Sequence, residues 1–153
     1  MRIKVEDAMT KAVWSCREDE SLACAARLMW DHDIGAVPVL GGDGELVGIV
    51  TDRDLCMAAY FGGERMSSIP LGRVMSKVVF TVEPGQSVEL AEDLMREKQV
   101  RRLPVVDGGQ VVGMITLGDL ARAAKVRRQI TGNEVSATFA AIVEPRAAVS
   151  AAA

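Results

Sequence analysis

Two copies of one short polar pattern contain the side chains best suited to chemistry. Thr51 and Asp54 follow one hydrophobic stretch and Thr116 and Asp119 follow another, each in the pattern Gly-h-h-Thr-x-x-Asp-Leu, where h is apolar. A threonine three residues before an aspartate is typical of a helix N-terminal cap, which stabilises a protein by about 1 kcal/mol without any ligand. A helix N-terminus also offers free N–H groups to a phosphate, and a short carboxylate there can accept hydrogen bonds from ribose hydroxyls. The pattern fits both interpretations.

The pattern is part of an internal repeat. Pairs that match at an offset of 66 residues include Met9 and Met75, Ser21 and Ser87, Leu28 and Leu94, and Pro38 and Pro104. Beyond the expected turn at 41–44, which corresponds to 107–109, the offset falls to 65 residues. Because a repeat sets both the fold and the symmetry of any site, we expect two related sites.

Each repeat predicts the element order β-α-β-β-α. The expected strands are 12–15, 36–40 and 46–50 in the first repeat and 78–82, 103–106 and 111–115 in the second. Ser21 and Ser87 stand at N-cap positions before helices with one apolar face, and closing helices begin after Thr51 and Thr116. Turns rich in aspartate and glycine join the last two strands as hairpins. The fold class is therefore α+β.

The repeat also predicts the domain organisation. We expect a first motif at 1–59, a linker at 60–70, a second motif at 71–129 and a partly disordered tail at 130–153. A lone core of about 60 residues is only marginally stable, so the two halves are expected to pack against each other.

Composition narrows the function. The chain has 153 residues and a net charge of −3, which argues against a general nucleic-acid binder. No run of 18 apolar residues and no secretory leader is visible, so we expect a cytoplasmic protein that does not enter membranes. Three cysteines without a C-x-x-C pair argue against disulfides and against a zinc site, and no metal site is expected. No nucleophile has a base partner in any visible constellation, so an enzyme is not expected.

The order and duplication of these motifs resemble the cystathionine β-synthase (CBS) domain family. The resemblance covers about residues 3–124 and depends on stretches such as Leu103-Pro104-Val105-Val106 and Gly48-Ile49-Val50-Thr51-Asp52-Arg53-Asp54. Two CBS motifs form a Bateman module, in which the motifs pack with pseudo-twofold symmetry. The resemblance implies that architecture for this chain.

The resemblance also implies ligands and site residues. Bateman modules bind adenosine-containing ligands in two clefts between the motifs, so Asp54 and Asp119 are expected to hold ribose hydroxyls, and Thr51 and Thr116 to contact phosphate or sugar. The expected lining of the base pockets is Lys11, Ala12, Val13, Ile34, Gly35 and Ala36 in one repeat and Lys77, Val78, Val79, Val100, Arg101 and Arg102 in the other. Because a cleft in this family often combines elements of both motifs, Asp54 is expected to act with Val100, Arg101 and Arg102.

The two repeats differ most in their arginines. Arg101 and Arg102 replace Gly35 and Ala36, and Arg53 replaces the glycine at position 118. Arginine forks suit phosphate oxygens, although surface arginines are more often only solvated. We therefore expect two unequal clefts. The stronger, phosphate-binding one contains Thr51, Arg53, Asp54, Arg101 and Arg102, and the weaker or base-only one contains Thr116, Asp119, Ile34 and Gly35.

The leading hypothesis is a stand-alone regulatory module, not an enzyme, that binds AMP, ADP or ATP and has no cofactor. A homodimer through the CBS helices and an unidentified protein target are expected partners. Two alternatives stay open for the clefts: they are empty in a purely structural or interaction module, or they bind S-adenosylmethionine. A third alternative is a nucleic-acid-associated regulator that uses Lys125, Arg127 and Arg128.

Overall fold

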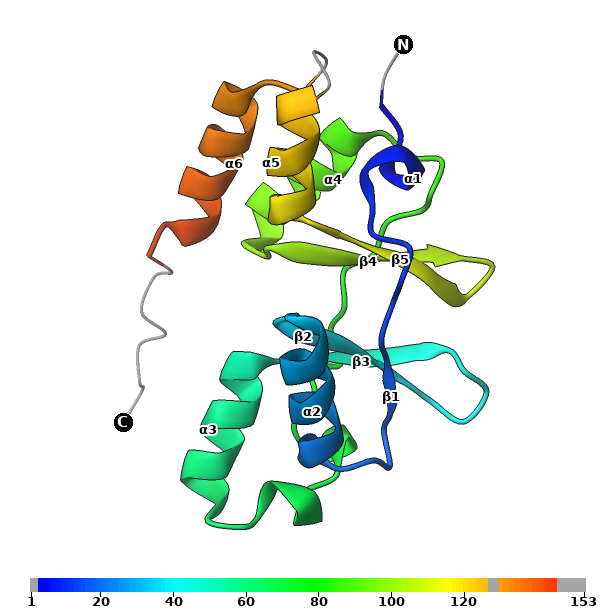
Figure 1. Cartoon of the computed structure of the whole chain (residues 1–153), viewed down its shortest axis with the longest axis vertical. Helices are drawn as coiled ribbons and strands as arrows, with labels where there is room; N and C mark the ends of the chain where they lie inside the picture. Colours follow the sequence, from blue (N-terminus) through cyan, green and yellow to red (C-terminus); the bar gives the residue numbers. More distant parts are fainter. Residues whose placement is uncertain (1–2, 127–129, 146–153) are drawn as a thin grey trace.

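Two small β-sheets face each other across the middle of the molecule, with helices on the outer side of each sheet (Figure 1). The computed structural model describes residues 3–126 and 130–145. The first sheet has the order β1 (Cys16–Arg17), β2 (Ala36–Leu40), β3 (Leu46–Thr51), and the second pairs β4 (Arg102–Asp107) with β5 (Gln110–Thr116). β1 runs parallel to β2, and both hairpins are antiparallel. The expected α+β class and the two hairpins are confirmed.

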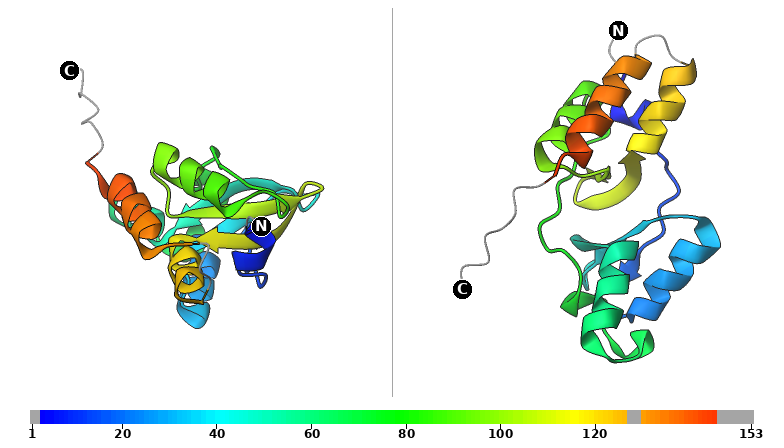
Figure 2. Two further views of the ribbon diagram at one scale, coloured as in Figure 1. Left: turned by 90° about the horizontal axis from the view of Figure 1, so that it is seen from above. Right: turned by 90° about the vertical axis from the view of Figure 1, so that its left-hand side faces the viewer.

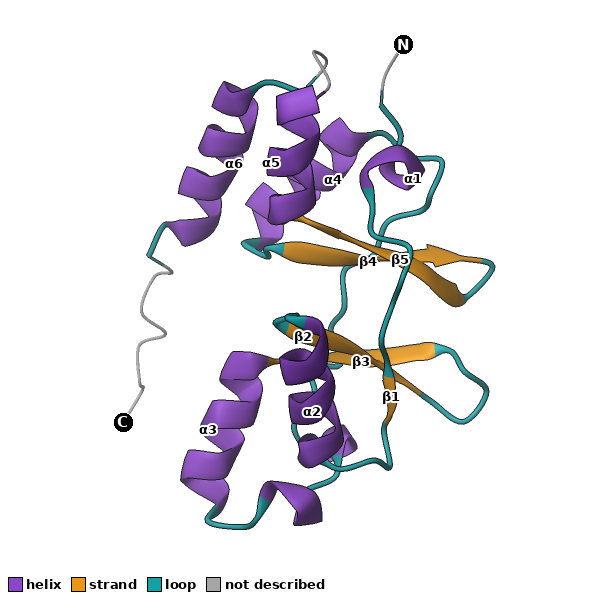
Figure 3. Cartoon of the chain, in the orientation of Figure 1, coloured by secondary structure: helices purple, strands orange, loops and turns teal. Residues whose placement is uncertain are grey.

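The described residues form six α-helices, four of which correspond in pairs through the repeat. The six are α1 (Val5–Ala8), α2 (Leu22–His32), α3 (Asp52–Gly62), α4 (Val88–Lys98), α5 (Leu117–Val126) and α6 (Gly132–Val143). Two short 3-10 turns cover Met66–Ser68 and Leu71–Arg73. Figure 3 shows α2 and α3 on the outer side of the first sheet and α4 and α5 on the outer side of the second. Ser21 and Ser87 occupy the N-cap positions of α2 and α4, as predicted.

The two repeats exchange their leading segments. Val5 of α1 is buried in the core of the second repeat, and Leu71 is buried in the core of the first. Each segment then pairs with a strand of the repeat it has joined: Thr10 pairs with Met114 of β5, and Ser76 pairs with Ile49 of β3. The exchange holds the halves together, because each core is completed by the other repeat.

This exchange explains the glycine of the Gly-h-h-Thr-x-x-Asp pattern. A Cβ atom at Gly113 would lie 2.4 Å from the sulfur of Met9, and a Cβ atom at Gly48 would lie 2.4 Å from the sulfur of Met75. Any side chain at either position would therefore displace the exchanged methionine. The same methionine–glycine contact therefore occurs in both repeats, between Met9 and Gly113 and between Met75 and Gly48.

The predictions of two strands and of part of the linker are wrong. Residues 12–15 form no strand, and 78–82 form only a single bridge from Val82 to Val105. Both segments cross from one half to the other, so most of their length has no neighbouring strand. Helix α3 continues to Gly62 before Gly63 ends it with a φ of 62°, so the first residues of the predicted 60–70 linker are helical.

The prediction of a tail that begins at 130 is wrong for residues 130–143. Thr131 and Glu134 form a capping box at the start of α6, and Ile130 and Ile142 are buried in the second core. Figure 2 shows α6 beside α4 and α5, so this helix adds a third helix to the second repeat only. The predicted end of the second closing helix at 127–129 and the tail residues 146–153 lie outside the described residues.

Candidate functional site

Two pockets lie between the halves, and each combines the Thr-x-x-Asp of one repeat with segments of the other. The Asp119 cleft has a volume of about 400 Å³, and Thr116 and Asp119 line it together with Val13, Ile34, Gly35 and Ala36. The Asp54 cleft has a volume of about 1030 Å³, and Thr51 and Asp54 line it together with Val79 and Val100. These volumes match the size range of small-molecule sites.

The carboxylate of Asp54 caps helix α3 and keeps one oxygen available. Thr51 donates to Asp54 Oδ2 from its backbone N–H at 2.8 Å and from its hydroxyl at 2.7 Å. The backbone N–H of Asp54 donates back to Thr51 Oγ1 at 3.2 Å, which completes a capping box. No described residue donates a hydrogen bond to Asp54 Oδ1. One oxygen therefore serves the fold, while the other remains available to a ligand.

The carboxylate of Asp119 caps helix α5 in the same way, but both of its oxygens are engaged. Thr116 donates to Oδ2 from its backbone N–H at 2.8 Å and from its hydroxyl at 2.7 Å. Thr10 donates to Oδ1 at 3.1 Å, and Arg122 forms an ion pair with the same oxygen. Only 5% of Asp119 is exposed.

The counterparts of Thr10 and Arg122 account for this difference. Ser76 stands in the place of Thr10, but its hydroxyl donates to the carbonyl of Val78 at 3.2 Å. Met57 stands in the place of Arg122 and has no hydrogen-bond donor in its side chain. Neither counterpart therefore reaches Asp54.

Arg101 and Arg102 line both clefts. The expectation that they belong to the Asp54 cleft alone is wrong, because β4 begins between the two pockets. The Arg102 guanidinium lies over Gly35, where a Cβ atom would come within 3.0 Å of Nη1. Burial lowers the pKa of Arg102 below its ordinary value. The nearby carboxylate of Asp52 opposes this effect, and the positive charge of Arg101 adds to it. Among the described residues, the Arg102 side chain has no hydrogen-bond or ion-pair partner, so its donors are available to a ligand.

An aromatic ring stands at the same place in each cleft. Trp14 lines the Asp119 cleft and stacks on His32, with ring centroids 3.7 Å apart. Phe80 lines the Asp54 cleft, and the Lys98 ammonium lies 5.3 Å from its ring centre. Lys98 stands at the repeat position of His32. In each repeat, the residue at the end of the helix therefore contacts the ring, by ring stacking in the first repeat and by a cation–π contact in the second.

Several cleft residues were missed from the sequence, and two predicted ones lie elsewhere. The missed residues include Thr10, Asp33 and Arg122 in the Asp119 cleft and Lys98, Gln99, Ile142 and Val143 in the Asp54 cleft. The repeat relates Asp33 to Gln99, and both have a left-handed backbone, with φ of 51° and 50°. Arg53 lines the Asp54 cleft as expected, whereas Lys11 and Lys77 are exposed and line neither pocket.

The family model for the CBS domain matches this chain twice, over residues 5–60 and 71–126. The chain belongs to the CBS domain family. Its two motifs form a tandem CBS pair, as the resemblance implied. The CBS domain-containing protein YhcV of Bacillus subtilis is 40% identical over 117 residues, which cover 76% of this chain and 82% of that protein. Hypoxic response protein 1 of Mycobacterium tuberculosis is 35% identical over 116 residues, which cover 76% and 81% respectively.

Solved structures agree with this assignment. The crystal structure of hypoxic response protein I with two coordinated zinc ions superposes with a TM-score of 0.72 at 34% identity, over 78% of this chain and 98% of that one. The CBS domain pair of protein MJ0100, in complex with 5′-methylthioadenosine and S-adenosyl-L-methionine, gives a TM-score of 0.74 at 25% identity, over 82% and 98%. Among the described residues, no helix combines the length and apolar character that crossing a membrane requires.

Proposed function

We propose that this CBS pair is a non-enzymatic regulatory module that binds AMP, ADP or ATP in the clefts between its motifs. One observation carries the proposal: Asp54 and Arg102 line the same cleft, and each has hydrogen-bonding groups that no described residue uses. A carboxylate oxygen and a guanidinium in one pocket are the groups that a ribose and a phosphate require.

In the Asp54 cleft, each part of a nucleotide has a complementary group. Asp54 Oδ1 accepts hydrogen bonds from the ribose hydroxyls. The phosphates lie near the N-terminus of α3 and near Arg53, Arg101 and Arg102, where the helix dipole and the guanidinium groups favour negative charge. The apolar side chains of Val79 and Phe80 receive the base.

The Asp119 cleft is proposed as the weaker site. Its volume is smaller, and ribose hydroxyls have to replace Arg122 on Asp119 Oδ1 before they can bind there. It is therefore suited to adenosine or AMP rather than to a triphosphate.

S-adenosylmethionine or methylthioadenosine is the second candidate ligand. The CBS pair of MJ0100 contains both molecules. The Asp119 cleft also contains the carboxylate of Asp33, which suits a positively charged ligand better than a phosphate chain. A purely structural or interaction module with empty clefts and a nucleic-acid-associated regulator are the remaining alternatives.

Thermal unfolding of nucleotide-free protein separates these candidates. A ligand present at 100 times its Kd stabilises a single site by about 2.7 kcal/mol. We expect AMP, ADP or ATP to raise Tm, whereas a response to S-adenosylmethionine alone indicates the second candidate. No shift with any of these ligands contradicts a sensing function and leaves the remaining alternatives.

A homodimer through the first repeat is the second part of the proposal. Trp30, Tyr60 and Phe61 on α2 and α3 are 88%, 77% and 77% exposed. Trp30 corresponds to Arg96, which donates a hydrogen bond to Thr138 of α6 at 3.1 Å. Because α6 covers the α4–α5 face, we propose that a second copy of the chain covers the equivalent α2–α3 face.

Sedimentation velocity tests the dimer. Trp30→Arg copies the residue of the second repeat and should yield a folded monomer. Val126→Arg changes a side chain on α5 that is 84% exposed, and should leave the dimer intact. A monomeric wild-type protein contradicts this part of the proposal.

The output of the module follows from ligand-dependent packing of its halves. A ligand shifts that packing only if it binds two states with different affinity, and a protein target then recognises the favoured state.

The three free cysteines suit a reducing compartment, which supports a cytoplasmic location.

A further inference from the structure

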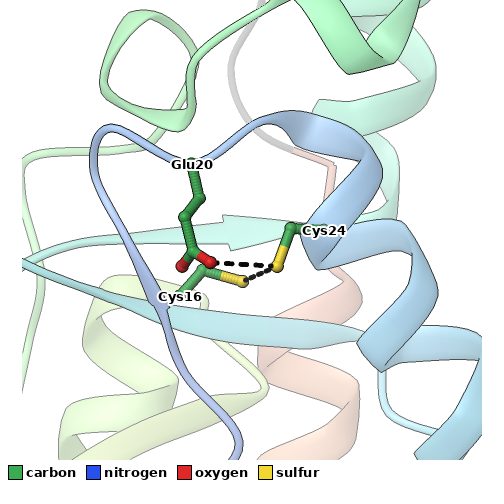
Figure 4. A group of neighbouring side chains, drawn as sticks. All are labelled: Cys16, Glu20 and Cys24. Carbon is green, nitrogen blue, oxygen red and sulfur yellow. Dashed lines mark hydrogen bonds between the residues drawn. The ribbon is translucent and has the colours of Figure 1, made fainter.

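Three potential metal ligands converge outside the two clefts, beside the N-terminus of α2 (Figure 4). They are the thiol of Cys16 on β1, the carboxylate of Glu20 and the thiol of Cys24 on α2, and their ligand atoms all lie within 4.8 Å of one another. The two sulfurs are 3.4 Å apart, and Cys24 Sγ lies 3.6 Å from Glu20 Oε1. Cys16 is buried, whereas Glu20 and Cys24 are half-buried, so an ion can reach the cluster from solvent.

Two of the three spacings are close to those of a tetrahedral zinc site, and the third, between Cys16 Sγ and the Glu20 carboxylate, is no more than 4.8 Å. With bonds of about 2.3 Å to sulfur and 2.1 Å to oxygen, tetrahedral angles place two sulfurs about 3.8 Å apart and a sulfur about 3.6 Å from an oxygen. The sulfurs therefore need to separate by only a few tenths of an ångström. The other carboxylate oxygen, Glu20 Oε2, accepts the backbone N–H of Arg17 at 2.6 Å, which holds Oε1 on the side of Cys24.

The second repeat shows which of these features the fold itself requires. Val82, Gln86 and Leu90 stand in the places of Cys16, Glu20 and Cys24. Gln86 Oε1 accepts the backbone N–H of Glu83 at 3.0 Å, as Glu20 does from Arg17. A neutral amide therefore suffices for this turn. The carboxylate charge and the two thiols are additional features of the first repeat, and all three face one point.

We propose that Cys16, Glu20 and Cys24 bind one Zn²⁺ ion, with a water molecule as the fourth ligand. On binding, each thiol loses its proton to solvent and each thiolate donates an electron pair to the metal, as the carboxylate does. The bound ion cross-links β1 to the first turn of α2. The segment that precedes β1 contains Val13 and Trp14 of the Asp119 cleft, so the metal fixes one end of that cleft wall.

Spectroscopic titration of the full chain tests the site. Reduced, metal-free protein is titrated with Co²⁺, which gives near-ultraviolet charge-transfer absorption when thiolates bind it, and then with Zn²⁺, which displaces it. We expect one ion per chain. Zinc should also protect Cys24 from alkylation, while Cys56, which is exposed on α3, continues to react.

Substitutions copied from the second repeat provide matched variants. The triple variant Cys16→Val, Glu20→Gln, Cys24→Leu should lose the charge-transfer band, Glu20→Gln alone should weaken binding at least tenfold, and Cys56→Ser should bind as wild type does. Cys24→Ser, at a half-buried position, decides the matter if the triple variant does not fold. The proposal is overturned if the reduced wild-type protein gives no band, or if Cys24→Ser retains wild-type affinity.

Discussion

The two clefts of this CBS pair share one backbone design but leave their carboxylates in different states. Asp54 and Asp119 each cap a helix through Oδ2 with nearly identical hydrogen bonds. Oδ1 of Asp119 is occupied by Thr10 and Arg122, whereas no described residue donates to Oδ1 of Asp54. The comparison shows that duplication has preserved the cap, while side chains outside the repeated pattern determine whether the second oxygen can serve a ligand.

The same contrast extends to the outer faces of the two halves. Helix α6 packs on α4 and α5 of the second repeat, whereas α2 and α3 of the first repeat present exposed aromatic side chains. The C-terminal end of α6 also reaches the Asp54 cleft, which Ile142 and Val143 line. The second repeat is therefore closed on its outer face, and the first is open.

The largest effect is expected from removal of the available carboxylate. Asp54→Ala should weaken nucleotide binding in the Asp54 cleft roughly 10- to 100-fold, because a hydrogen bond to a charged group contributes about 1.5–3 kcal/mol. Equilibrium dialysis with labelled ATP measures the change. Asp119→Ala is the matched control and should leave this site intact. Equal losses of ATP affinity in the two variants contradict the difference assigned to the two carboxylates.

A smaller effect, shared by both clefts, is expected from Arg102→Ala, which copies Ala36 of the first repeat. Because Arg102 lines both pockets, phosphate-bearing ligands should bind about tenfold more weakly in each. A tenfold loss is what removal of one hydrogen bond from a charged group is expected to cause. Adenosine, which has no phosphate, should be unaffected. Calorimetry with AMP and adenosine distinguishes the two results, and a loss confined to one cleft shows that the arginine is not shared.

The Asp119 cleft should improve when Arg122 is replaced by the residue of the first repeat. Arg122→Met frees Asp119 Oδ1 from its ion pair, so adenosine affinity in this cleft should rise about fivefold, equivalent to about 1 kcal/mol. Calorimetry in the Asp54→Ala background isolates this site. Unchanged or weaker binding indicates that Arg122 does not compete with the ligand.

A change in stability without a change in binding is expected at Glu92, on the face of α4 near α6. Only 4% of Glu92 is exposed, and no residue within 3–126 or 130–145 forms a hydrogen bond with its Oε1. Burial raises the pKa of Glu92, and the positive charge of Arg96 opposes this effect. The negative charges of Glu134, Glu89 and Asp93 raise the pKa of Glu92 further. The folded state therefore favours the protonated acid. This stabilisation is complete below the ordinary pKa and disappears as the pH rises through the raised pKa.

Glu92→Gln should accordingly increase the free energy of unfolding by about 1 kcal/mol at pH 7, and the gain should shrink towards zero in acid. Urea unfolding at several pH values measures this dependence. Glu97→Gln, at an exposed position of the same helix that does not contribute to the pKa of Glu92, is the control. A difference that does not depend on pH contradicts the role assigned to burial.

The repeat allowed much of the fold to be predicted, because spacing and hydrophobic periodicity are local signals. The hairpins, the N-caps and the combination of Asp54 with Val100 in one cleft are all present. The exchange of leading segments, the position of Arg102 between the clefts and the contact from Thr10 to Asp119 depend on packing between distant residues. Helix α6 has no counterpart in the first repeat, so the duplication contained no signal for it.

A crystal structure of the protein with one equivalent of ATP decides whether the available carboxylate of Asp54 marks the nucleotide site. We expect nucleotide in the Asp54 cleft, with ribose hydroxyls on Asp54 Oδ1 and phosphates at Arg101 and Arg102, while Arg122 still forms its ion pair with Asp119. Nucleotide in the Asp119 cleft alone, or in neither cleft, contradicts this expectation.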